Sequence, residues 1–166
     1  MVSHDPNRSF GFIVSDVTRL LRRGFNRRAQ RMGLGLTPAQ WQTLAHLRRN
    51  EGINQGALAQ ILEVQPITLS RLIDRLEAAG WVDRRPDPGD RRAVRLFLTA
   101  AAEPILDRIR AVAMETIAEA MAGIPDAERE RIIDALLIVR ENLLCQDVVA
   151  GSEDLVIEQE EVPTDA

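Results

Sequence analysis

The sequence predicts a mainly α-helical protein, a winged helix-turn-helix joined to long N- and C-terminal helices. Three observations predict this fold class. Residues 54–79 show two short amphipathic helices separated by a tight turn, and residues 81–98 change to the alternating pattern of a hairpin. Residues 9–32 and 99–147 carry apolar residues at helical spacing. Two short helices and a turn followed by a hairpin make a winged helix-turn-helix.

The first predicted helix spans residues 9–32 and ends at Gly33 and Gly35. Apolar residues recur on it at three- and four-residue spacing: Phe12, Ile13, Val17, Leu20 and Leu21. Its other face carries arginines: Arg19, Arg22, Arg23, Arg27 and Arg28. The second helix begins at a capping box, with Thr37 as N-cap, Pro38 in the first position and Gln40 three residues after the cap. It runs to about Asn50 with Trp41, Leu44, Ala45 and Leu47 inward.

The third and fourth helices form the helix-turn-helix. Asn54 caps a short helix that runs through Leu62, and residues 63–65 turn the chain. Pro66 begins the fourth helix, which continues to Ala79. Its predicted buried stripe is Leu69, Leu72, Ile73 and Leu76. Gly80 ends this helix, because the position after a helix often needs a left-handed backbone that glycine adopts freely.

The hairpin after Gly80 is the predicted wing. Residues 81–85 form one strand, residues 86–90 form a turn rich in Pro, Gly and Asp, and residues 92–98 return. Val94, Leu96 and Leu98 share one face of the second strand. Two further helices follow, from Thr99 to about Gly123 and from Pro125 to about Asp147.

The terminal helices carry more apolar surface than one small winged region can cover. We therefore expect residues 1–150 to form a single domain, in which residues 10–32 and 99–147 are dimerisation helices and residues 37–98 are the DNA-binding winged part. The apolar positions of the last two helices are Ile105, Ile109, Val112, Ile117, Ile132, Ile133, Leu136, Leu137, Leu143 and Leu144. Residues 151–166 are acidic and poor in aromatic residues, and we expect them to be disordered.

Charge is distributed unevenly along the chain. The net charge is -4, but residues 1–98 hold 16 arginines against nine acidic residues, whereas residues 99–166 hold five arginines against 16. The front half is therefore the part expected to face an anionic partner. All 21 basic residues are arginine; this suits phosphate and guanine recognition, although a GC-rich coding sequence is the stronger explanation.

Several classes of function have no support in the sequence. No apolar run approaches the roughly 18 residues of a membrane span, so no membrane partner is expected. The first ten residues lack the basic-then-apolar order of a secretory signal, and we expect a cytoplasmic protein. His4, His46 and Cys145 are the only His and Cys residues and show no metal-ligand spacing. We expect no catalytic residues, no metal, no cofactor and no enzymatic activity.

The fourth helix has a polar face suited to the major groove of double-stranded DNA. Its candidate base- or phosphate-contacting residues are Gln65, Thr68, Ser70, Arg71 and Arg75. Arg71 and Arg75 lie about one turn apart. The alternative is an ordinary solvated face on which Asp74 and Arg75 neutralise each other.

The wing adds a second candidate DNA contact. Arginines gather around the hairpin: Arg84, Arg85, Arg91, Arg92 and Arg95. An arginine at a hairpin tip fits a narrow minor groove, where the potential is most negative. Asp90, two residues before Arg92, can hold its guanidinium through a charge-assisted hydrogen bond. The alternative is a charged turn that keeps the protein soluble.

These residues together resemble the MarR family of bacterial transcription regulators, in particular its SlyA branch. The likeness covers about Phe10 to Leu144 and rests on this series: Asn54, Leu62, Gln65-Pro66, Arg71, Asp74-Arg75-Leu76, Gly80, Asp90-Arg91-Arg92-Ala93 and Leu98-Thr99. The resemblance implies an obligate homodimer built from the first and last two helices. It places Thr68, Ser70 and Arg71 at recognition positions, and Asp90 and Arg92 at the wing.

The resemblance also implies a small aromatic or lipophilic acid as ligand, bound between the dimer helices and the winged part. Trp41 matches an aromatic residue that lines this crevice, and Arg23 is a candidate cation for a carboxylate. Trp41 as plain core is the stronger interpretation. SlyA-like proteins can place histidine at position 45, where this chain has Ala45 and then His46. An ordinary half-buried histidine is favoured at His46.

Cys145 near the end of the last helix is expected to be a buried structural thiol rather than an oxidant sensor. The function predicted from the whole chain is sequence-specific DNA binding by a homodimeric repressor at a palindromic operator, with possible release by the acid. The alternative is a winged-helix dimerisation or protein-interaction module that does not bind an operator.

Overall fold

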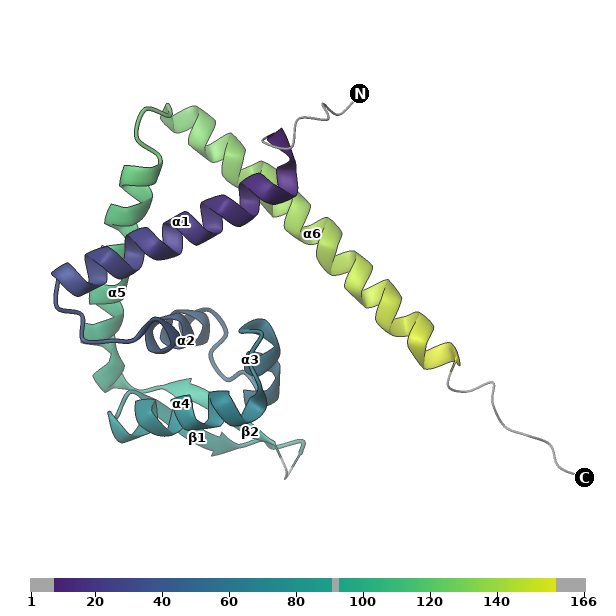
Figure 1. Ribbon diagram of the computed structural model, residues 1–166. Coiled ribbons are helices and arrows are strands. Elements are labelled where there is room, and N and C mark those ends of the chain that lie inside the picture. Colours follow the sequence, from purple (N-terminus) through teal and green to yellow (C-terminus); the bar gives the residue numbers. More distant parts are fainter. Residues whose placement is uncertain (1–7, 91–92, 158–166) are drawn as a thin grey trace, which may run out of the picture. The chain divides into compact units, whose positions relative to one another are not determined.

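The computed structural model describes residues 8–90 and 93–157, and side chains as far as residue 146 (Figure 1). The chain divides into two compact units, residues 1–120 and residues 121–166. The first unit contains α1 to α5 and the two strands; the second contains α6. The fold is mainly helical with one small antiparallel sheet, which confirms the predicted winged helix-turn-helix class.

Local capping signals set the starts of the first helices. Helix α1 spans Phe10–Arg31 and helix α2 spans Pro38–Arg49. The predicted capping box is present: the Gln40 backbone N–H donates to Thr37 Oγ1, and the Thr37 backbone N–H donates to Gln40 Oε1 at 2.9 Å. Helix α3 spans Gln55–Ile61, and Asn54 Oδ1 accepts from the Gly56 backbone N–H at 2.7 Å.

Helix α4, Pro66–Ala78, is the second helix of the helix-turn-helix. Leu69, Ile73 and Leu76 are fully buried and Leu72 is half-buried, as the apolar spacing predicts. Gly80 has a φ of 76°, the left-handed conformation that a helix end favours. The Gly80 backbone N–H then donates to the Glu77 carbonyl oxygen at 2.8 Å.

The wing consists of strand β1, Val82–Pro86, and strand β2, Val94–Leu98, paired antiparallel with Val82 opposite Leu98 and Arg84 opposite Leu96. Strand β2 begins two residues later than the predicted Arg92. Its other edge meets the segment before α3, where the Leu96 backbone N–H donates to the Ile53 carbonyl oxygen at 3.0 Å. The hairpin is therefore attached at both edges of β2 near its base.

The core of the first unit joins the winged part to α1 and α5. After the short 3-10 turn η2, Ala100–Ala102, helix α5 spans Glu103–Ala120 and buries Ile105, Ile109 and Val112. Helix α1 contributes Phe25 and Ala29 to the same core. The apolar residues near the start of α1, which the sequence assigns to a dimer interface, are exposed in the single chain: Phe12, Ile13, Val17 and Leu20.

Helix α6 spans Asp126–Ile157, ten residues further than the predicted end near Asp147. Residues 151–157 are therefore helical rather than disordered, and residues 158–166 lie outside the described residues. The sequence has no proline between Pro125 and Pro163 to end the helix earlier. The apolar residues that α6 exposes are Ile132, Ile133, Leu136, Leu137, Ile138, Leu143 and Leu144.

Candidate nucleic-acid interface

The exposed face of α4 carries four of the five predicted recognition residues. Gln65 is the N-cap residue, and Thr68, Arg71 and Arg75 follow along the exposed side of the helix. The opposite side is anchored by fully buried leucine and isoleucine, so the backbone beneath these residues is fixed by the core. Ser70 differs: it is half-buried at the edge of this face.

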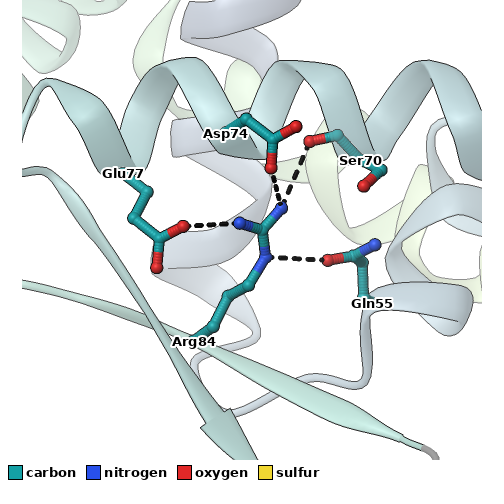
Figure 2. Close-up of polar contacts among 5 residues, drawn as sticks. All are labelled: Gln55, Ser70, Asp74, Glu77 and Arg84. Carbon is teal, nitrogen blue, oxygen red and sulfur yellow. Dashed lines mark hydrogen bonds and ion pairs between the residues drawn. The ribbon is translucent and has the colours of Figure 1, made fainter.

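Arg84 of β1 lies against α4, with its guanidinium among polar groups of that helix (Figure 2). Its Nη2 donates to Asp74 Oδ1 at 2.6 Å and to the Ser70 carbonyl oxygen at 3.2 Å. Its Nη1 donates to Glu77 Oε2 at 2.5 Å, and its Nε donates to Gln55 Oε1 of α3 at 3.4 Å. Arg84, which the sequence groups with the other arginines of the hairpin, is therefore held against α4.

The same contacts bear on one part of the alternative interpretation of α4, in which Asp74 and Arg75 neutralise each other. Asp74 pairs with Arg84 of the wing, and no ion pair joins it to Arg75 among the described residues. Arg71 and Arg75 likewise have no carboxylate partner in the described part of the chain. Both guanidinium groups are thus available on the exposed face of α4, which fits a contact with phosphate or base edges.

Other wing residues hold the hairpin in shape. Arg95 Nε donates to Asp87 Oδ2 at 2.7 Å, and Asp87 Oδ1 accepts from the Gly89 backbone N–H at 2.8 Å. The Gly89 N–H first, and then Arg95, lower the pKa of Asp87. Arg85 lies over the Phe97 ring, 4.2 Å from its centroid. Asp90 is exposed, while Arg91 and Arg92 lie outside the described residues.

The two predicted ligand residues line different hollows. Trp41 lines a cavity of about 200 Å³ with Phe25 and Ile117, whereas Arg23 lines a larger, arginine-rich hollow on α1. Trp41 also packs on Phe25, with ring centroids 3.9 Å apart, and its Nε1 donates to Asn26 Oδ1 at 3.0 Å. It is at once part of the core and a cavity wall.

Arg22, not Arg23, lines the cavity that contains Trp41. Sequence reasoning missed this residue, although Arg22 precedes the buried Phe25 by three positions and therefore shares its face of α1. His46 is half-buried, and its pKa is lowered by burial first and then by Arg49 and Arg22.

Arg28, one of the five arginines on the other face of α1, is largely buried against α5. Its side chain is 16% exposed and pairs with two glutamates of α5, Glu119 at 2.8 Å and Glu115 at 3.1 Å. Arg28 lowers the pKa of Glu119 through the hydrogen bond and its charge. Cys145 is exposed in the chain, so the expectation of a buried thiol does not hold within one protomer.

Membrane spans and metal clusters are both absent from the described residues. No helix in this part of the chain is long and apolar enough to cross a membrane. No group of three or more His, Cys, Asp or Glu residues in the described ranges is arranged to hold a metal ion.

Comparison with known proteins gives consistent matches. The model of the MarR family matches residues 34–93. The transcriptional regulator PA3341 is 34% identical, with 81% of this chain and 98% of that one covered and a TM-score of 0.67. A MarR transcriptional regulator from Methanosarcina mazei Go1 is 29% identical, with 81% and 95% covered and a TM-score of 0.69. A MarR crystal structure is 26% identical, with 87% and 97% covered and a TM-score of 0.74.

The matched family region contains α2, α3, α4 and the wing up to Ala93, which are the elements that position the exposed face of α4. The solved structures extend the likeness over most of the chain. Fold, site and relatives therefore agree, and the chain belongs to the MarR family of transcriptional regulators.

Proposed function

We propose that this protein is a homodimeric, sequence-specific DNA-binding repressor. The observation that carries the proposal is the face of α4: Gln65, Thr68, Arg71 and Arg75 are exposed above a fully buried apolar stripe. An amide, a hydroxyl and two guanidinium groups can read base edges in the major groove and hold the backbone. The wing extends the contact to the flanking minor groove through Arg92, with Asp90 as its partner.

Dimerisation follows from the exposed apolar residues of the terminal helices. Phe12 of α1 is 70% exposed and Leu143 of α6 is 57% exposed. A second copy of the chain covers such helix faces in a twofold arrangement. Twofold symmetry makes the operator palindromic, with the two α4 helices about 34 Å apart in successive major grooves. A dimer bound across a promoter excludes polymerase, which is why we assign repression.

The cavity beside Trp41 is the proposed ligand site. Its walls are apolar, from Phe25, Trp41 and Ile117, and Arg22 supplies a cation for a carboxylate. A small aromatic or lipophilic acid fits this combination. Its walls come from α1, α2 and α5, so an occupant that moves these helices changes the spacing of the recognition helices and releases DNA.

Selection of duplexes from a randomised pool tests DNA recognition and identifies the operator sequence in the same experiment. The proposal predicts enrichment of one palindromic sequence by the wild-type protein. Arg92→Ala is predicted to weaken binding to that duplex by about 1–3 kcal/mol with the dimer intact. A pool that stays random would contradict the proposal.

The second candidate function is a winged-helix module for dimerisation or protein contact. The hydrophobic Ile67, 63% exposed on the same face of α4, favours it as a protein contact. Selection separates the two functions, since a protein-interaction module enriches no DNA sequence.

A further inference from the structure

We propose that Arg84 is a positioning residue for DNA recognition: it holds α4 at the angle to the wing at which Thr68 and Arg71 meet one operator sequence. This inference rests on the proposed function and names a residue that determines its specificity. Arg84 itself does not face the DNA-binding side, because its side chain is 23% exposed and lies against α4.

The geometry of the contacts carries the first step. One guanidinium joins three elements, since it leaves β1, donates to Asp74, Glu77 and the Ser70 carbonyl of α4, and reaches Gln55 of α3 (Figure 2). The planar fork of arginine supplies these donors in fixed directions, whereas a lysine ammonium is a point charge on a flexible stem. Arg84 therefore fixes rotation of α4 as well as its distance from the wing.

The contact with the Ser70 carbonyl lies next to the recognition residues. Ser70 directly precedes Arg71 in α4, and it is the backbone, not the side chain, that Arg84 holds. A backbone contact turns the whole helix segment, so its loss changes the direction of both Thr68 and Arg71. Displacement by about 1 Å is enough to lose aligned hydrogen bonds to base edges.

Charge gives Arg84 a second effect. Asp74 and Glu77 lie on the helix that carries Arg71 and Arg75, and both carboxylates are partly exposed, at 59% and 42%. Without a partner they would repel phosphate close to the two arginines. The Arg84 guanidinium pairs with both, so the surface facing DNA keeps its positive character.

Arg84→Lys and Arg84→Gln separate the two effects, and Arg85→Gln is the matched control. Arg85 is the next residue of β1, is more exposed, and pairs with Asp83 while lying over Phe97. Each variant is measured against the selected duplex and a scrambled duplex of equal length at several salt concentrations. All measurements are made well below the melting temperature of each variant, so that loss of folding does not contribute.

We expect Arg84→Lys to lower the ratio of selected to scrambled affinity by about 10-fold or more, with scrambled binding and its salt slope nearly unchanged. Arg84→Gln is expected to lower both affinities as well as the ratio. Arg85→Gln is expected to lower both affinities alike and leave the ratio intact. An unchanged ratio in Arg84→Lys, or an equal fall in Arg85→Gln, overturns the inference.

Hydrogen exchange of the DNA-free protein keeps this result distinct from failure of the proposed function. Arg84→Lys is expected to speed exchange of the amides of residues 70–79, whereas Arg85→Gln leaves them protected. A wild-type protein that prefers no duplex removes the DNA function and, with it, the recognition role of Arg84. If exchange of the amides of residues 70–79 is still faster in Arg84→Lys, Arg84 stabilises α4 but has no role in DNA recognition.

Discussion

Helix α4 of the winged part differs from α6 and the start of α1 in how far it buries its large apolar side chains. In α4 the three main apolar residues are fully buried, while in α1 and α6 large apolar residues stay exposed, Phe12 at 70% among them. The winged part thus buries most of its large apolar side chains in a core that it shares with Phe25 of α1 and Ile105 of α5, whereas the start of α1 and α6 leave large apolar side chains on the surface. This difference is consistent with the proposed division of roles, in which the winged part contacts DNA and the terminal helices form the dimer.

The largest effect expected is in the buried core of the winged part. Ile73→Ala removes a fully buried side chain of α4 and should lower the free energy of unfolding by about 2–5 kcal/mol. Ile67→Ala, on the exposed face of the same helix, should change it by less than about 0.5 kcal/mol. Urea unfolding at fixed protein concentration measures both. Equal losses of unfolding free energy in Ile73→Ala and Ile67→Ala would mean that α4 is not anchored by its buried side.

The assembly region should respond to charge instead. Leu136→Asp places a carboxylate among the exposed apolar residues of α6 and should raise the dimer dissociation constant by about 100-fold or more. Asn142→Asp adds the same charge to α6 outside this series and serves as the control. Sedimentation equilibrium measures the association. Equal dimerisation in Leu136→Asp and wild type would remove α6 from the interface.

The DNA-facing surface should respond in affinity and not in stability. Arg71→Ala removes an exposed guanidinium from α4 and should weaken binding to the selected duplex by about 1–3 kcal/mol. Arg110→Ala on α5 removes an equal charge at an exposed position away from α4. Fluorescence anisotropy at fixed salt compares them. If Arg110→Ala lost as much affinity for the duplex as Arg71→Ala, the loss would come from the change in net charge and not from a contact made by Arg71.

A smaller effect is expected where the two regions join. Thr37→Ala removes the N-cap of α2 and should lower the free energy of unfolding by about 1 kcal/mol. Thr37→Ser keeps the hydroxyl that accepts from the Gln40 N–H and should stay close to wild type. The urea midpoints of the two variants measure the difference. A Thr37→Ser variant that is destabilised as much as Thr37→Ala would contradict a capping role for the Thr37 hydroxyl.

The smallest effect concerns pH. Burial, Arg49 and Arg22 lower the pKa of His46, so the folded protein favours the neutral imidazole. Its stabilisation is complete above the ordinary histidine pKa of about 6.5 and is lost as pH falls through the folded-state value. Between pH 7.5 and 5.5 the urea midpoint should therefore fall more in wild type than in His46→Gln, by less than the change caused by Thr37→Ala. Parallel falls would exclude His46 as the cause.

The sequence predicted the features that depend on neighbours along the chain. The Thr37–Gln40 capping box, the Asn54 cap and the stop at Gly80 each involve residues a few positions apart, and all three are confirmed. The buried stripe of α4 followed from helical period in the same way. Local chemistry fixes these features regardless of the rest of the fold.

Contacts between elements were harder to predict. Adjacent Arg84 and Arg85 look alike in the sequence, but strand alternation puts Arg84 on the same side as the buried Val82, so it meets α4. Arg28 shares the buried side of α1 with Phe25, three residues before it, for the corresponding helical reason. In both cases the spacing from a buried residue indicated the buried side of the element. The signal was hard to see because several neighbouring residues of β1 and α1 are also arginines.

The most direct test of DNA recognition by α4 is a salt series with the duplex selected by the wild-type protein and a scrambled duplex of equal length. Sequence-specific recognition predicts preference for the selected duplex at every salt concentration, with the logarithm of affinity falling against the logarithm of salt by about 0.9 per neutralised phosphate. Equal, weak binding to both duplexes at every salt concentration would contradict sequence-specific recognition by the exposed face of α4.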